Sequence, residues 1–360
     1  MRENVVDALK KCAAALQHGN PRLANTEMGR VLDLAENDAK PGTRKLIRDF
    51  AEALACRAYG LHPKYFSFPL PDWKNSMCSS RHCLFDAVSW AIADVFKGKR
   101  KRKVHVIELV KHMDIYDQWT DMLNLACGWR DLTHLRLSFL VQENVEFSKE
   151  SEEELIEMAN ILDFEFEYKI IPVNSLADID VSLLEMRDGE FVVVNCMFVL
   201  SKMLSEALAL EKVLLTVRDV IKADIMIVAE HDANHSQSDF LLRFDESLRY
   251  YSSLFGEDRF SDKNEPYFRY QMCNMVACEG SNRVERHQTW AQWKSLLTHY
   301  GFSIDNLSAD CASSRNYWPM NWENGILVTR STEREKQPLF FVSAWKTSTS
   351  PFKSLGSYEG

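Results

Sequence analysis

The side chains best suited to chemistry follow the apolar run 225–230. Glu230 and His231 are adjacent, and His235 comes four positions later. A carboxylate and two imidazoles can transfer protons or bind a metal ion. Ligands in open α/β sheets bind where strands such as 225–230 end. Zinc sites of the HExxH type also need a glutamate within a helix and a third ligand, neither of which is evident here. A hydrogen-bonded loop that caps the next helix is therefore the preferred interpretation.

A second place for chemistry is the turn after the first predicted strand. S-adenosylmethionine sites use a glycine-rich turn there, because the cofactor approaches the backbone too closely for a Cβ atom. Residues 109–127 contain no glycine, and Lys111, His112 and Met113 occupy the turn. Glu108 at the strand end could bind a ribose or an amine, but a polar residue at a strand end is ordinary. We therefore expect no cofactor, no catalytic residues and no methyl transfer.

The segment after Ala277 is rich in charge. Glu279 to Asn282 predict a turn followed by a helix N-cap, and Glu285 stands three residues past Asn282 as a capping-box partner. The first turns of that helix would then carry Arg283, Glu285, Arg286 and His287. Such a group can form a charged docking surface or an ion-pair network that ties the helix to the core. The second interpretation is preferred.

The cysteines do not suggest a metal site. The chain contains nine, at irregular spacing: Cys12, Cys56, Cys78, Cys83, Cys127, Cys196, Cys273, Cys278 and Cys311. Cys78/Cys83 and Cys273/Cys278 each have four intervening residues, which is wider than the CxxC knuckles of zinc ribbons. An odd number of scattered cysteines is typical of reduced thiols in a cytosolic or nuclear protein. No structural metal is expected.

A basic run precedes the first predicted strand. Six basic residues fall within seven positions: Lys97, Lys99, Arg100, Lys101, Arg102 and Lys103. A run of this kind can be a nuclear import signal or a phosphate-binding patch, and a solvated linker can have the same composition. The chain as a whole is acidic, with 43 Lys+Arg against 52 Asp+Glu and a formal charge of -9. That balance argues against nucleic-acid binding over the whole surface.

The elements that must position these residues change along the chain. Apolar residues recur at helical spacing in four stretches, around 5–16, 23–35, 43–60 and 84–95. Short apolar strands then alternate with helical stretches such as 199–222. The predicted strands are 104–109, 134–140, 164–170, 191–195 and 225–230. Strands alternating with crossover helices predict a parallel sheet.

The last part of the chain predicts an antiparallel edge. Ile326–Arg330 and Leu339–Trp345 are strand runs joined by a polar segment, which indicates a hairpin. The predicted fold class is α/β, a Rossmann-like, methyltransferase-type, mostly parallel sheet with a terminal antiparallel hairpin and an N-terminal helical cap. The expected units are a cap at 1–96 to which the middle region can contribute, a basic linker at 97–103 and a core at 104–360. The tryptophans expected in the core are Trp290, Trp293, Trp318, Trp322 and Trp345.

Two classes of protein are excluded by the distribution of apolar residues. Hydrophobic residues make up 46% of the chain, but no uninterrupted apolar run reaches the ~20 residues of a membrane span. The first residues, MRENVVDALKK, carry charge and lack the apolar stretch of a signal peptide. We therefore expect a folded protein without a membrane segment.

Several strings resemble, in the right order, the motifs of the GRAS family of plant transcriptional regulators. Val104-His105-Val106-Ile107-Glu108 resembles the VHIID motif, with glutamate at the fifth position. Val276–Gly280 followed by Arg283-Val284-Glu285-Arg286 resembles the ACEG and RVER signature. Ser343-Ala344-Trp345 is similar to the terminal SAW motif. Arg269–Cys273 replaces the arginine-bearing step of the PFYRE region, which is typical of a divergent member. Because the chain starts directly at the domain, we expect a domain-only member.

The resemblance implies a single GRAS domain over the whole chain and a nuclear regulator of transcription. Such a protein acts mainly by protein–protein interaction with DNA-binding transcription factors, including zinc-finger proteins, and with other GRAS proteins in homo- or heterodimers. DNA contact would be indirect or weak, and the basic run would be a nuclear import signal. Two alternatives remain: a small-molecule-binding or methyltransferase-like enzyme on the same core, and a transcription factor that binds DNA directly.

Overall fold

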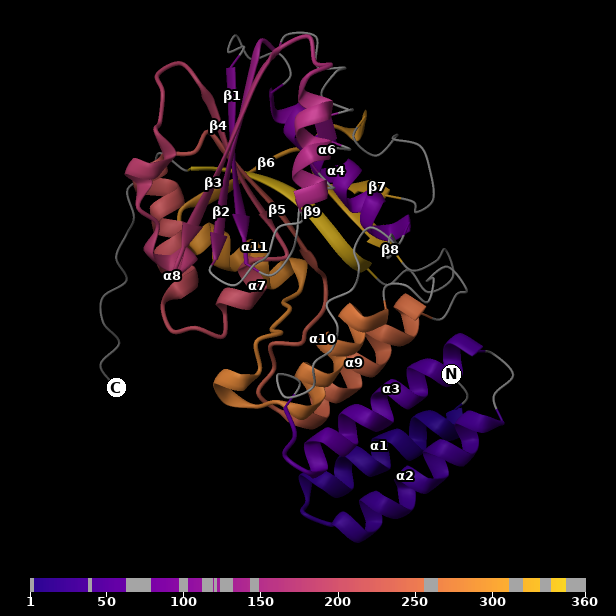
Figure 1. Ribbon diagram of the computed structural model, residues 1–360. Helices are drawn as coiled ribbons and strands as arrows, with labels where there is room; N and C mark the ends of the chain where they lie inside the picture. The colour runs from indigo at the N-terminus through magenta and orange to yellow at the C-terminus, as the bar shows by residue number, and fades with distance from the viewer. Residues whose placement is uncertain are drawn as a thin grey trace, which may run out of the picture.

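The computed structural model places a mixed sheet with flanking helices beside a smaller group of helices that contains the N-terminus (Figure 1). This architecture confirms the predicted α/β class with a mostly parallel sheet. The residues that the structure describes are 3–37, 41–62, 79–96, 103–111, 119, 122–123, 132–142, 149–255, 265–310, 320–330 and 338–347.

Five parallel strands form one half of the sheet, in the order β3-β2-β1-β4-β5. They are β1 (Lys103–Val110), β2 (His134–Gln142), β3 (Glu165–Val173), β4 (Phe191–Met197) and β5 (Ile225–His231). β4 and β5 are buried along their whole length, and this explains their uninterrupted apolar sequences. β3 is an edge strand: its first six residues alternate between exposed and half-buried, and Ile171 and Val173 near its end are buried. All five predicted strands are confirmed.

The other half of the sheet is antiparallel. β9 (Pro338–Thr347) lies antiparallel beside β5, and β8 (Ile326–Arg330) pairs antiparallel with β9, which confirms the predicted hairpin. β7 (Met320–Glu323) pairs with β8, and β6 (Phe302–Asp305) also pairs with β9. Sequence analysis missed these two strands, since four residues are too few to show a period of two.

Helices that are far apart in the sequence pack together in the smaller group. α1 (Glu3–Gln17), α2 (Pro21–Glu36) and α3 (Pro41–Ala58) pack on one another, and α3 also contacts α9 (Phe240–Phe255) and α10 (Glu265–Ala277). Figure 1 shows α9 and α10 between these helices and the sheet. α4 (Ser79–Phe96) instead packs against β5 and β9.

The other helices whose bounds the structure describes lie in the connections between the elements already named. They are α6 (Lys149–Ala159), α7 (Leu200–Met203), α8 (Ala209–Leu215), a π-helical turn at Thr216–Ile221, α11 (Trp290–His299), and 3₁₀ turns at Leu176–Asp178, Val181–Leu184 and Gly280–Asn282. The predicted single helix over 199–222 is therefore broken. The break lies before α8, where Leu208 adopts a left-handed conformation with φ +61°. Among the described helices, none has both the length and the apolar composition needed to cross a bilayer.

Tryptophans mark the core on one face of the sheet. Trp293 and Trp345 are fully buried, and Trp290 is half-buried against Trp345 with ring centroids 5.8 Å apart. Trp345 Nε1 donates to Ser343 Oγ at 2.9 Å, so the polar atom of the indole is satisfied within the SAW motif. Trp322 is 45% exposed, and its assignment to the core is wrong because β7 lies at the sheet edge. Trp318 lies outside the described residues.

The burial of Trp345 predicts a large stability effect. Trp345→Ala should lower the free energy of unfolding by about 3–5 kcal/mol, because it leaves a cavity beneath β9. Trp322→Ala is a control at a tryptophan that is 45% exposed and donates to the Leu307 carbonyl at 2.7 Å, and it should cost clearly less than Trp345→Ala. Urea denaturation of both variants measures the difference. Equal costs for the two would contradict the burial of Trp345.

Candidate functional site

The VHIID-like motif ends at the carboxyl edge of the sheet. Glu108 of β1 lies in register with Asn195 of β4, and Asn195 Nδ2 donates to the two carboxylate oxygens at 2.8 and 3.0 Å. Burial raises the pKa of Glu108 to about 8, although the hydrogen bonds from Asn195 and Trp119 oppose the increase. Lys111, the next charged residue, pairs with Glu206. Glu108 and Lys111 thus contact other side chains of this chain, whereas the turn at 112–118 lies outside the described residues.

The first four residues of the same motif, 104–107, are also buried. Arg136 of β2 donates to Glu190 at 3.0 and 2.6 Å, and its Nη2 lies 3.0 Å from His105 Nδ1. A guanidinium can only donate, so Nδ1 of His105 accepts and its Nε2 donates to Ser138 Oγ at 2.8 Å. Burial and the charge of Arg136 lower the pKa of His105 to about 3. The three remaining motif residues are buried in the sheet: Val104, Val106 and Ile107.

A buried ion pair holds the RVER motif. Lys202 of α7 contacts Glu285 with Nζ and Oε1 2.6 Å apart, and both side chains are buried. His287 Nε2 lies 3.2 Å from the other carboxylate oxygen. Burial alone would raise the pKa of Glu285, but Lys202 and His287 lower it well below its ordinary value. Glu285 therefore stays ionised, and the loop after α10 is fastened to α7.

Three histidines extend this network with one consistent arrangement of protons. His287 donates from Nε2 to Glu285, so its Nδ1 accepts from His235 Nδ1 at 3.0 Å. The rings of His231 and His287 are stacked, with centroids 4.0 Å apart and an interplanar angle of 4°. Burial is the main cause that lowers the pKa of both His235 and His287. Both imidazoles are therefore neutral. The charges of Lys202 and Glu285 then balance each other.

His231 has its own partners at the end of β5. Tyr250 donates its hydroxyl to the carbonyl of Leu339 at 2.9 Å, so His231 Nδ1 donates to the tyrosine oxygen at 2.8 Å. Its Nε2 then accepts from Gln271, 3.3 Å away. In the part of the chain that the structure describes, no group of three or more His, Cys, Asp or Glu side chains could hold a metal ion. These contacts support the interpretation of this segment as a hydrogen-bonded loop.

Glu230 lies near the end of β5, directly before His231. Its Oε1 accepts from the backbone N–H of Ser201 at 3.0 Å, and its Oε2 has no hydrogen-bond partner in the described structure. Burial raises the pKa of Glu230 to about 7. The negative charge of Glu285 is a further cause of this increase, because ionised Glu230 would be a second buried negative charge beside it.

The predicted helix start at Asn282 is wrong. Residues 283–289 are not helical, and α11 begins at Trp290 with Thr289 and Gln292 as the capping box. Asp232 also accepts from the Trp290 N–H at 2.9 Å, so the histidine loop caps α11. The physical reason is that Glu285 turns inward to Lys202, which is incompatible with a role as a capping residue on the surface.

One carboxylate, that of Glu279, contacts both the N-terminal helices and α9. Glu279 Oε1 accepts from Arg57 of α3 at 2.8 Å and from Arg243 of α9 at 2.6 Å. Arg243 is fully buried and also donates to the Met275 carbonyl at 2.9 Å. The guanidinium of Arg57 lies over the ring of Phe240, 3.6 Å from its centroid. The segment that bears the RVER motif therefore receives contacts from both groups of helices.

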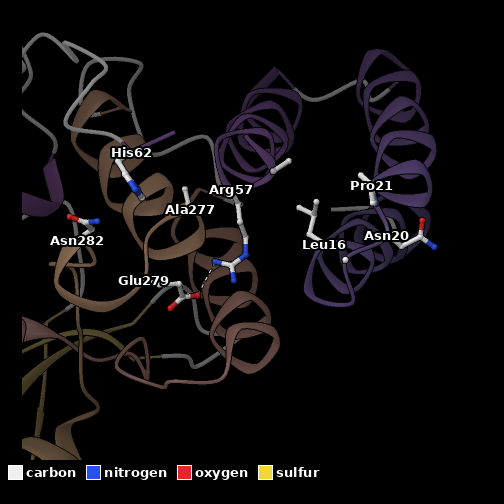
Figure 2. Close-up of a pocket in the computed structure, with 10 residues that line it drawn as sticks. Leu16, Asn20, Pro21, Arg57, His62, Ala277, Glu279 and Asn282 are labelled. Carbon is white, nitrogen blue, oxygen red and sulfur yellow. Dashed lines mark hydrogen bonds and ion pairs between the residues drawn. The ribbon is translucent and has the colours of Figure 1, made fainter. Parts of the chain in front are cut away.

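A cleft of about 470 Å³ lies beside this junction (Figure 2). One wall is the turn between α1 and α2, and the other is formed by the end of α3 and the segment after α10. The residues that line it are Leu16, Gly19, Asn20, Pro21, Arg57, Ala58, His62, Ala277, Glu279 and Asn282. Figure 2 shows Arg57 joined to Glu279 within the second wall, opposite Leu16, Asn20 and Pro21. Its volume is within the range of about 300–1,000 Å³ that is typical of binding pockets.

Sequence analysis did not find several residues on which this region depends. Lys202, Arg243 and Gln271 are polar side chains within apolar helices, and all three are buried. The available signal was a lone charge in an apolar stretch, as in Leu-Ser-Lys-Met at 200–203. Of the basic run, Lys103 is the exposed first residue of β1, and the other five residues lie outside the described part of the chain.

Comparison with known proteins decides the family. The model of the GRAS domain family matches residues 5–346. The chain belongs to the GRAS domain family. It is 34% identical to the DELLA protein GAI1 of Vitis vinifera, over 96% of this chain and 62% of that protein. It is 35% identical to the DELLA protein RGA of Arabidopsis thaliana, over 97% of this chain and 62% of that protein.

The resemblance found in the sequence is thus confirmed. This GRAS chain spans about three fifths of the length of these two curated relatives. A solved structure, that of SCL7 from Oryza sativa, superposes with a TM-score of 0.72 at 21% identity, over 95% of this chain and 99% of that one. At that identity the likeness supports the fold.

The ion pair between Lys202 and Glu285 predicts strong coupling. Glu285→Gln or Lys202→Met should each lower the free energy of unfolding by about 3–5 kcal/mol, because each leaves the other charge buried without its partner. The double variant should lose much less than the sum of the two. Lys212→Met, at the exposed pair with Asp178, is a control that should barely change stability. Additive costs in a denaturation cycle would contradict the pairing.

The pKa of Glu108 predicts a dependence on pH with a definite sign. Its carboxyl titrates at about 8 when folded and near 4.3 when unfolded. Between these values the folded state binds more protons, so the contribution of Glu108 to stability falls as pH rises, by about 1.4 kcal/mol per unit. Glu108→Gln removes this titration, while the other titrating groups are common to both proteins. Unfolding at about pH 5 and about pH 8 should therefore show a smaller loss in the variant, and equal losses would refute the assignment.

Proposed function

We propose that this protein is a plant transcriptional regulator that acts in the nucleus through protein–protein interaction. The observation that carries the proposal is the match to the GRAS domain family over residues 5–346. The contacts of the motif side chains are consistent with this proposal. Glu108 binds Asn195 and Glu285 binds Lys202, both inside the domain. In this reading the motifs build the domain, and partners bind its surface.

The partners proposed are DNA-binding transcription factors, including zinc-finger proteins, and other GRAS proteins. Exposed apolar side chains on the helices of the smaller group support a role in binding proteins: Leu23 and Leu32 on α2 and Leu242 on α9 are between 44% and 58% exposed. Large apolar residues that are exposed on a helix are common at interfaces between proteins. Import into the nucleus is assigned to the basic run 97–103.

Contact with DNA is proposed to be indirect. The chain carries a net charge of -9 and has a pI near 5.7, so few positions can neutralise phosphates. Six clustered basic residues support weak contact that disappears as salt rises. Specific sites would then be reached only through a partner that reads the bases.

Tethering tests this function directly. The chain fused to a heterologous DNA-binding domain should change the output of a reporter in plant protoplasts, whereas that domain alone should not. Unchanged output would contradict the role in transcription.

Selection from a random DNA pool by the purified protein at physiological salt tests how it reaches DNA. No sequence should be enriched, because contact through the basic run is salt-sensitive. Enrichment of one sequence that is lost on mutation of that sequence would favour direct DNA binding.

A further inference from the structure

Two contacts fix how α3 and α10 lie beside each other. Arg269 of α10 pairs with Glu52 of α3, and its Nε lies 3.5 Å from Asp49 Oδ1. Further along both helices, Arg57 donates from Nη1 to the carbonyl of Val276 at 3.1 Å. Residue numbers increase in the same direction on both helices between these contacts, so α3 and α10 run parallel here. Residues that lie between the two contacts therefore face one another in the same order.

This register brings two thiols together. Cys56 comes about one helical turn after Glu52, and Cys273 comes about one turn after Arg269. The side chains of Cys56 and Cys273 are hydrogen-bonded to each other, and both residues are buried. Both cysteines are free. Thiols in contact meet the first requirement of a disulfide, whose Cβ atoms lie only about 3.5–4.5 Å apart.

The two thiols differ in how readily they lose a proton. Burial raises the pKa of Cys273 well above its ordinary value, and the hydrogen bond that it donates to Cys56 adds to the increase. Burial also raises the pKa of Cys56, but there the hydrogen bond from Cys273 opposes the increase. Cys56 is therefore the first of the two to become a thiolate, which is the form that reacts with oxidants.

A third thiol in this region has a different partner. Cys278 Sγ lies 3.5 Å from Nδ1 of His62, in the segment that follows α3. Two residues that line the cleft, Ala58 and Ala277, follow Cys56 and Cys273 by two and four positions. The cleft thus opens within about one helical turn of the paired thiols, which gives a small oxidant a short path to them.

We propose that Cys56 and Cys273 form a reversible disulfide when the protein is exposed to hydrogen peroxide. The Cys56 thiolate attacks one peroxide oxygen and becomes a sulfenic acid, and the other oxygen leaves as water after it gains a proton. The thiol of Cys273 then attacks the sulfenic sulfur. The S–S bond forms, and the sulfenic oxygen leaves as a second water. Two electrons pass from the two sulfurs to the peroxide, and a thiol reductant reverses the reaction.

The disulfide would join the N-terminal helices covalently to the helix that precedes the RVER segment. Its two cysteines are far apart in the chain, so the bond closes a long loop and restricts the unfolded state. The oxidised protein should therefore be more stable than the reduced protein. A reducing compartment keeps the two thiols apart, so the bond would report oxidation. This proposal goes beyond the proposed function and does not depend on it.

Peptide mapping of the oxidised full-length chain tests the proposal. Trypsin releases Cys56 in the peptide 49–57 and Cys273 in the peptide 270–283, which also contains Cys278. After treatment with hydrogen peroxide and alkylation of the remaining thiols, mass spectrometry should find these two peptides joined. The same link should form in Cys278→Ser, where Cys273 is the only cysteine left in the second peptide. Dithiothreitol should separate the peptides.

Rate and stability provide independent measurements. Crosslinking should accelerate about tenfold between about pH 7 and about pH 8, because the thiolate fraction of Cys56 rises by that factor below its pKa. Oxidation should raise the Tm of the wild type, and dithiothreitol should restore it. Cys56→Ser should lack this increase. Cys12→Ser is a matched control, because Cys12 is also buried but donates to the Ala24 carbonyl at 3.4 Å, and it should respond as the wild type does.

Three outcomes would overturn the proposal. The first is a free 49–57 peptide in folded protein whose other thiols have been oxidised. The second is a crosslink from Cys56 that disappears in Cys278→Ser, which would make Cys278 the partner. The third is an equal yield of the link between 49–57 and 270–283 in urea, since unfolded chains pair their thiols without the register of α3 and α10.

Discussion

The cost of burying charge organises this molecule. Lys202 and Glu285 lie where water does not reach, so each requires the other at hydrogen-bond distance. This requirement turns the segment after α10 inward and prevents it from starting a helix at Asn282. His287 then donates to the same carboxylate, and His235 donates to His287. One ion pair therefore sets the tautomers of two imidazoles and the path of a loop.

A partly exposed carboxylate adds to the packing of α3 on α9 and α10 that joins the N-terminal helices to the remainder of the chain. Glu279 is only six residues before Glu285, and it is shared by Arg57 of α3 and Arg243 of α9. The segment 279–287 thus connects three bodies: the N-terminal helices, α9 with α10, and the carboxyl edge of the sheet. The cleft lies directly outside this connection. Glu279 lines it, whereas Glu285 lies buried against Lys202.

In this sheet, polar side chains at the strand ends bind other groups of the same chain. The order β3-β2-β1-β4-β5 with an antiparallel neighbour beside β5 is suited to ligand binding at the carboxyl edge. Here Asn195 binds the carboxyl of Glu108, and Ser201 binds that of Glu230. Both carboxyls are raised in pKa by burial and contribute to packing between strands and loops. The architecture alone does not specify what the domain does.

The sequence by itself determined the main strands and the family. Apolar periodicity predicted the five parallel strands and the hairpin of β8 and β9, because burial on both faces leaves continuous apolar runs. The motif strings identified the GRAS resemblance, which the match over residues 5–346 bears out. Only the tertiary structure decided which polar residues meet. Lys202 and Glu285 are far apart in the chain, and so are Arg57 and Glu279. No local pattern encodes such pairs, since they arise when separate elements exclude water from the same place.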